Sequence, residues 1–161
     1  MKKFLLMAVG VIMLLVVSSA YYPAASDSLV GADAPNLELV NNYAEFDLRE
    51  SDGEYVLLSF WSSTDPQSRI ANKSYDGSLG KTDKNVKYVA VNLDPSTGVF
   101  EEIVKIDKLN ASSQYHVDGD WSAVLGDYNL RQGYVSYLIN PSGVIVAQNP
   151  TIEDVYSMIQ G

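Results

Sequence analysis

Cysteine is absent from this chain of 161 residues, which therefore has neither a disulfide bond nor a thiolate. Thiol–disulfide exchange needs a thiolate nucleophile, so the sequence excludes that chemistry. A lipid anchor attached to an N-terminal cysteine is excluded as well. Stability must come from the folded core alone, because no cross-link restricts the unfolded chain.

Histidine occurs only once, and basic residues are few. A metal site would rely mostly on oxygen ligands, and no zinc pattern, phosphate-binding loop or nucleophile elbow is present. Lysine and arginine total 11 against 20 aspartates and glutamates, which gives a net charge of -9. Because these motifs are missing, we expect no cofactor. Because the net charge is negative, we expect neither nucleic acid nor an anionic membrane surface as a partner.

The N-terminus has the pattern of a secretory signal peptide. Two lysines precede an unbroken apolar run at 4–17, and Ser18-Ser19-Ala20 supplies small residues for cleavage. The run is shorter than a membrane span, which needs about 20 residues. We expect residues 1–20 to be removed and the protein to be exported to a periplasmic or secreted location. An uncleaved anchor is the alternative, and only then would the chain contact a membrane.

A flexible leader at 21–31 and a single domain at 32–161 are predicted to follow. Apolar, β-rich segments predict strands at 37–40, 55–61, 86–93, 114–117, 135–139 and 144–148. Helical spacing or capping residues predict helices at 43–48, 65–75, 99–109 and 120–128, and from 151 onward. Turn signals lie at 76–77 and 140–143. Two parallel β-α-β units followed by a hairpin make this an α/β domain.

Polar residues at the helix starts are expected to act as caps. Asn41 or Asn42 would cap the helix at 43–48, and Asp120 the helix at 120–128. Thr151 and Asp154 have the spacing of a capping box.

The segment YVLLSFWSSTDPQSR at 55–69 runs from an apolar strand into a helix opened by Asp65 and Pro66. It resembles the active-site segment of exported, cytochrome-maturation-type thiol-disulfide oxidoreductases, which is roughly F-W-A-S-W-C-P-P-C-R. The sequences ADAPNL at 32–37 and YLINPSGVI at 137–145 resemble two further landmarks of that family. The resemblance covers 32–161 and implies a thioredoxin-like fold, a central mixed β-sheet flanked by helices, with a short N-terminal extension.

The chain departs from the family at its three functional positions. Asp65 and Ser68 stand where the family has its two redox cysteines, and Tyr134 stands where it has a cis-proline. The Gly133–Tyr134 peptide bond is expected to be trans, because a cis bond before a residue other than proline costs about 2.5–4 kcal/mol.

Asp65 has two interpretations, a structural N-cap and an acid or base. The cap is favoured, because a helix N-terminus lowers a carboxylate pKa and so makes a poor base near neutrality. The residues around it that are candidates for binding a partner are Trp61, Thr64, Asp65, Pro66 and Tyr134. Trp61 and the tyrosines also have a simpler role in packing the core.

Two functions remain open. The first is a protein-binding or scaffolding module that has lost the redox pair and takes another protein or an extended peptide as its partner. The second is an enzyme with replacement chemistry at the same pole. His116 and Asp118 would point to one side of an extended segment and could approach Asp65 as a metal site or an acid–base pair. We favour the binding module, because no complete catalytic set is present.

Overall fold

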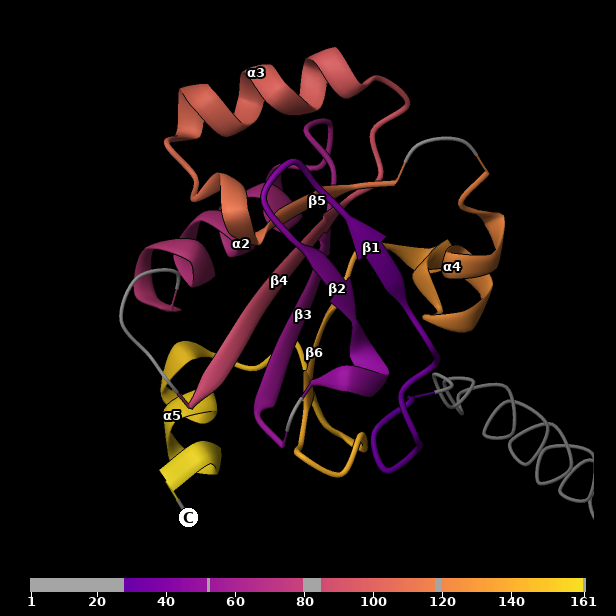
Figure 1. Ribbon diagram of the computed structural model, residues 1–161, viewed down its shortest axis with the longest axis vertical. Helices are drawn as coiled ribbons and strands as arrows, with labels where there is room; N and C mark the ends of the chain where they lie inside the picture. The colour runs from indigo at the N-terminus through magenta and orange to yellow at the C-terminus, as the bar shows by residue number, and fades with distance from the viewer. Residues whose placement is uncertain (1–27, 52, 80–84, 118–119, 161) are drawn as a thin grey trace, which may run out of the picture.

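A computed structural model describes residues 28–160 except 52, 80–84 and 118–119. The predicted signal peptide at 1–20 and most of the predicted leader at 21–31 lie outside the described residues. The described strands build a five-stranded sheet in the order β5-β4-β3-β6-β7 and a separate β1–β2 hairpin (Figure 1). This is the thioredoxin-like arrangement expected from the sequence.

Two parallel crossovers and a hairpin form the main sheet. Strands β3 (Tyr55–Trp61), β4 (Val86–Asn92) and β5 (Gln114–His116) run parallel. Strands β6 (Ser136–Ile139) and β7 (Ile145–Gln148) pair antiparallel beside β3. Helix α2 (Pro66–Leu79) connects β3 to β4, and α3 (Thr97–Asp107) connects β4 to β5. The remaining elements are α4 (Ser122–Asp127), α5 (Ile152–Gln160) and the 3-10 turns η1 (Leu48–Glu50), η2 (Ala111–Ser113) and η3 (Leu130–Gln132).

Both faces of the central sheet are covered, because side chains alternate between them along each strand. Leu58 and Phe60 of β3 face the β1–β2 hairpin and α4, which contribute apolar side chains to that half of the core. Leu57 and Trp61 face the other way and pack with residues of α2, α3 and α5. Figure 1 shows the hairpin in front of the sheet and α4 beside it. A strand covered on both faces needs the nearly continuous apolar sequence seen at 56–61.

The helix predicted at 43–48 is wrong. These residues lie in β2 (Glu45–Asp47), which pairs antiparallel with β1 (Glu38–Val40), and at the start of η1. The Asn41 side chain accepts the backbone N–H groups of Tyr43 and Ala44, both at 2.8 Å, and so closes a hairpin turn instead of capping a helix. The same turn places Phe46 in the core.

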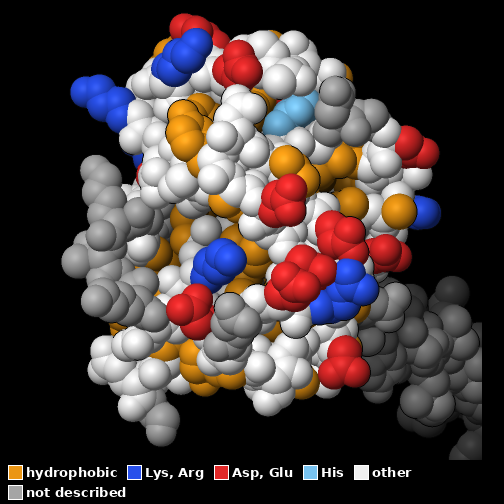
Figure 2. Space-filling view, viewed as in Figure 1, with side chains coloured by type: hydrophobic (Ala, Val, Ile, Leu, Met, Phe, Trp, Pro, Cys, Tyr) orange, Lys and Arg blue, Asp and Glu red, His pale blue; other side chains and the backbone are white. Residues whose placement is uncertain are grey.

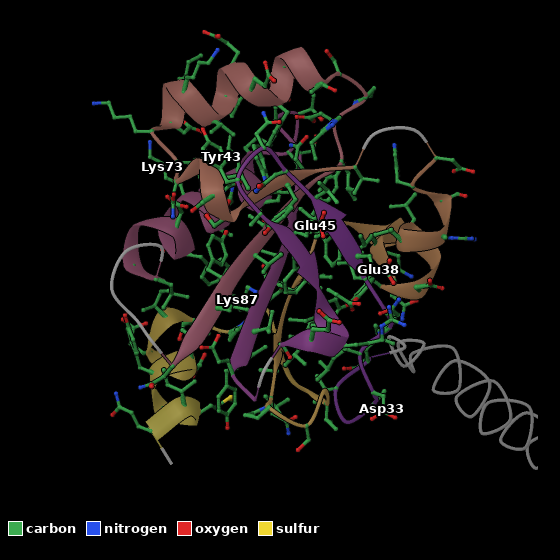
Figure 3. All side chains as sticks on the ribbon, in the orientation of Figure 1. Asp33, Glu38, Tyr43, Glu45, Lys73 and Lys87 are labelled. Atoms are coloured by element: carbon green, nitrogen blue, oxygen red, sulfur yellow. The ribbon has the colours of Figure 1, made fainter. Side chains whose placement is uncertain are left out.

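Tertiary contacts hold this hairpin over the sheet. The Asn41 amide donates to the carbonyl groups of Ser112 at 3.2 Å and Gln114 at 3.1 Å, which ties the turn to β5. Lys87 of β4 lies over the Phe46 ring, 4.9 Å from its centroid (Figure 3). These contacts favour a strand over a short helix. They could not be predicted from the sequence at 43–48, because they involve residues far away in the chain.

Helix limits differ in smaller ways from the predictions. Asp76 and Gly77 were expected in a turn but lie inside α2, which continues to Leu79 because Tyr75 and Leu79 are buried against the sheet. Thr151 and Asp154 form the predicted capping box, with the Asp154 N–H donating to the Thr151 hydroxyl at 3.1 Å. Across the described part of the chain, every helix is too short or too polar to cross a bilayer.

Candidate functional site

Asp65 caps α2, as the sequence predicts. Its carboxylate accepts the Ser68 N–H at 2.7 Å, and its carbonyl accepts the Arg69 N–H at 3.1 Å. The Ser68 hydroxyl donates to the same carbonyl at 3.2 Å and accepts the Ser62 N–H at 3.3 Å. Asp65 and Ser68, which stand at the cysteine positions, are therefore hydrogen-bonded to each other and stabilise the first turn of the helix.

A groove of about 530 Å³ opens beside this cap, between α2 and the segment before β6. We call it the groove pocket. Three aromatic side chains and one alanine supply its apolar surface: Phe60, Ala71, Tyr75 and Tyr134. Its polar lining residues are Asp65, Gln67, Ser68, Gln132, Ser136 and Asn149, with Gly133 between them. The structure thus brings Asp65, Ser68 and Tyr134 together in one depression.

The segment at 133–135 forms the far wall of the groove pocket. The described residues contain no cis peptide bond, so Gly133–Tyr134 is trans, as predicted. Gly133 has a φ of 142°, a conformation that glycine adopts without a steric penalty. Val135 accepts the Phe60 N–H at 3.0 Å, which joins the wall to β3. The backbone of Tyr134 makes no hydrogen bond to any described residue and is free to pair with an added segment.

The other predicted binding residues lie outside the groove pocket. Trp61 is fully buried and packs against Phe100, with ring centroids 6.2 Å apart, so it supports the site from within the core. Thr64 is exposed, and its hydroxyl lies 2.9 Å from that of Ser62. Pro66 is exposed beside a different hollow, on the side of α2 that faces α3.

His116 is engaged at the end of β5. Its Nε2 lies 2.8 Å from the Asp94 carbonyl, so this nitrogen carries the proton and donates. The ring stacks on Phe100 with centroids 5.3 Å apart. No hydrogen bond joins His116 to Asp65, and Asp118 lies outside the described residues. In the described ranges, no three histidine, aspartate or glutamate side chains are grouped to hold a metal ion.

Asp94 is the residue at this pole that the sequence analysis missed. Its side chain is buried, and it accepts the Ser62 hydroxyl, the Ser63 N–H at 3.0 Å and the Asn92 amide at 3.0 Å. Burial raises the pKa of Asp94, but the hydrogen bonds from Ser62, Asn92 and Ser63 together outweigh burial and hold the pKa below its ordinary value. This carboxylate fixes the turn that leads from β3 to the Asp65 cap.

Arg69 points away from the groove pocket. Its guanidinium makes a two-bond pair with Asp107 of α3, at 2.6 and 2.9 Å, and Lys73 lies 3.7 Å from the same carboxylate. The Arg69 hydrogen bonds hold the pKa of Asp107 below its ordinary value. Both basic residues of α2 therefore pair with Asp107 of α3, and no described lysine or arginine pairs with Asp65.

Comparison with known proteins agrees with this geometry. No protein-family model and no curated protein matches the chain. Among solved structures, a thioredoxin-like protein from Parabacteroides distasonis is 30% identical, with a TM-score of 0.67 over 80% of this chain and 97% of that one. A thiol:disulfide interchange protein from Bacteroides sp. is 22% identical, with a TM-score of 0.69 over 81% and 88% of the two chains.

A third structure shares the fold. It is a putative thiol:disulfide interchange protein DsbE from Chlorobium tepidum, 22% identical, with a TM-score of 0.62 over 81% of this chain and 93% of that one. At that identity the likeness concerns the fold, and the cysteine-free sequence excludes the dithiol exchange that such a name implies. On the identity and coverage of the Parabacteroides distasonis structure, this chain belongs to the thioredoxin-like proteins.

Proposed function

We propose that this chain is an exported binding module that holds an extended segment of another protein in the groove pocket. The observation that carries the proposal is the pocket itself, an open groove of about 530 Å³ at the pole where Asp65 and Ser68 replace the cysteines. Without a cysteine thiol no mixed disulfide with a partner can form, so the groove is proposed to act by non-covalent binding.

The walls of the groove pocket suit an extended chain. Among the described residues none hydrogen-bonds the backbone N–H or C=O of Tyr134, two positions before β6, and an added segment can form main-chain hydrogen bonds with such groups. The half-buried Tyr134 ring lies beside them as a surface for one side chain of the segment. Rigid aromatic side chains next to a main-chain pairing site are typical anchors of protein recognition.

Export is part of the same proposal. It is supported by the basic start, the apolar run at 4–17 and the small residues at 18–20. In a periplasmic or secreted location the partner would be another exported protein or an unfolded segment of one.

Binding of peptides to the chain without the predicted signal peptide, residues 21–161, tests the proposal and keeps Leu29 and Gly31, which contact the core and β7. A library of unstructured peptides of about eight residues would be screened by fluorescence anisotropy, and the best binder followed by NMR chemical-shift changes. Tyr134→Ala should weaken that binder by at least about tenfold, the effect expected of an anchor residue. Tyr43→Ala is the matched control, because Tyr43 is 69% exposed at the tip of the β1–β2 hairpin (Figure 3).

Two results would contradict the proposal. One is a library in which no peptide binds. The other is a binder whose affinity is unchanged by Tyr134→Ala and whose chemical-shift changes fall outside the groove pocket. The second result would place the binding surface elsewhere on the domain.

A further inference from the structure

The groove pocket has a one-sided charge. Among the described residues that line it, Asp65 is the one acidic residue, and none is lysine or arginine. The surface of the chain has the same sign, because the sequence contains 20 acidic and 11 basic residues. Figure 2 shows acidic side chains gathered over the β1–β2 hairpin on one face of the molecule. A ligand entering the groove therefore meets negative charge both at long range and in contact.

Only one of the two Asp65 carboxylate oxygens accepts a hydrogen bond from a described residue. Oδ1 accepts the Ser68 N–H, whereas Oδ2 accepts no hydrogen bond from a described residue. The N-terminus of a helix carries about half a positive charge, which reduces the negative charge of the cap without cancelling it. No lysine or arginine in the described ranges pairs with Asp65, since Arg69 and Lys73 are bound to Asp107.

The rest of the pocket is built for a long side chain with an apolar stem. Phe60 and Tyr75 line it from the core, 1% and 7% exposed, whereas the half-buried Tyr134 ring and Ala71 are its accessible apolar residues. Lysine and arginine bury their methylene groups against such surfaces and keep the charged end polar. A cation next to an aromatic ring face gains further from the ring quadrupole.

We propose that the groove pocket selects an extended segment through one lysine or arginine side chain. The stem of that side chain lies on the Tyr134 side of the pocket, and its charged end binds the free Oδ2 of Asp65. This inference rests on the proposed function, because it names the class of segment that the same groove takes. The partner is accordingly a basic exported protein or a basic stretch of one.

A set of host peptides tests the selection directly. Each is acetylated, amidated and seven residues long, made of glycine, serine and threonine except at its centre, which is arginine, lysine, norleucine or glutamate. At low salt the arginine and lysine peptides should bind about tenfold more tightly than the norleucine peptide, with glutamate the weakest. The advantage should shrink as salt is raised, because the pair is partly solvated.

Asp65→Asn tests the negative charge of Asp65 separately from its capping hydrogen bond, because asparagine keeps the capping oxygen and has no charge. Asparagine caps a helix as well as aspartate does, so the melting temperature should change little. The variant should bind the arginine peptide no more than about twofold more tightly than the norleucine peptide, while the affinity for norleucine stays unchanged. Glu102→Gln is the control, because it removes one charge from an exposed position of α3 outside the groove pocket.

The outcomes distinguish this inference from the proposed function. If arginine and norleucine peptides bind equally and both depend on Tyr134, the groove binds peptides but charge does not select them. Retention of the arginine preference in Asp65→Asn would also overturn the inference. If no peptide of the set binds and the wider library fails as well, the proposed function and the inference fall together.

Discussion

Removing the buried Asp94 carboxylate should destabilise the domain strongly. In Asp94→Ala, the Ser63 N–H and the Asn92 amide lose their acceptor. The Ser62 hydroxyl keeps one, because the Thr64 hydroxyl lies 2.9 Å away. Two unsatisfied donors at about 1–3 kcal/mol each predict a loss of about 2–6 kcal/mol. Small domains have about 5–15 kcal/mol in total, so the effect is large.

Asp94→Asn is the graded variant. Its remaining oxygen can still accept the Ser62 hydroxyl and the Ser63 N–H, but its amino group would meet the Asn92 amide. One mismatched donor predicts a loss of about 1–3 kcal/mol. Urea unfolding of both variants, followed by tryptophan fluorescence, measures the two losses and their order.

The pH dependence gives a second test of the same carboxylate. The folded pKa of Asp94 lies below the unfolded one, so its contribution to stability is complete above the unfolded value of about 4. That contribution disappears as pH falls through the folded value. The stability difference between wild type and Asp94→Asn should therefore shrink between about pH 5 and pH 2. A loss below about 1 kcal/mol in Asp94→Ala, or a difference independent of pH, would refute the reasoning.

Three further predictions concern the chemistry, the cap and the N-terminus. Insulin reduction and disulfide isomerisation by the purified protein should equal the buffer blank, because no residue supplies a thiol; measurable turnover would contradict this. Asp65→Ala should lower the free energy of unfolding by about 0.5–2 kcal/mol, and Asp65→Asn by only a few tenths. A melting temperature unaffected by alanine, together with a lost activity, would favour an acid–base role for Asp65. Mass spectrometry of the exported protein should find an N-terminus after Ala20, and an intact Met1 would indicate an anchor instead.

Local signals in the sequence identified most of the fold. Asp65-Pro66 and the Thr151–Asp154 box lie where helices begin, and 140–143 forms the turn between β6 and β7. These signals work because a cap or a turn is made by residues that are neighbours in sequence. The hairpin at Glu38–Asp47 was missed because Asn41 fits either a helix cap or a turn, and contacts with β5 decide between them.

The buried polar residues were harder to recognise from sequence. Asp94 lies between β4 and α3, next to Pro95 and Ser96, yet its partners Ser62 and Ser63 belong to the turn after β3. Asn72 of α2 is fully buried. Its amide donates to the Gln114 side-chain oxygen of β5 at 3.2 Å and accepts the Gln114 amide at 3.2 Å. Nothing in the local sequence marks such pairs, because their partners meet only when the sheet is assembled.

The sequence by itself determined that this protein cannot carry out thiol–disulfide exchange, because folding cannot supply a thiol that the chain lacks. It also determined the order of strands and helices from β3 to α5, which depends on periodicity and caps, although not the β1–β2 hairpin. Only the tertiary structure decided that Arg69 binds Asp107 at the end of α3, so that no described lysine or arginine pairs with Asp65 beside the groove pocket. That outcome depends on how α2 and α3 pack on one face of the sheet, and side chains distant in sequence become partners only through such packing.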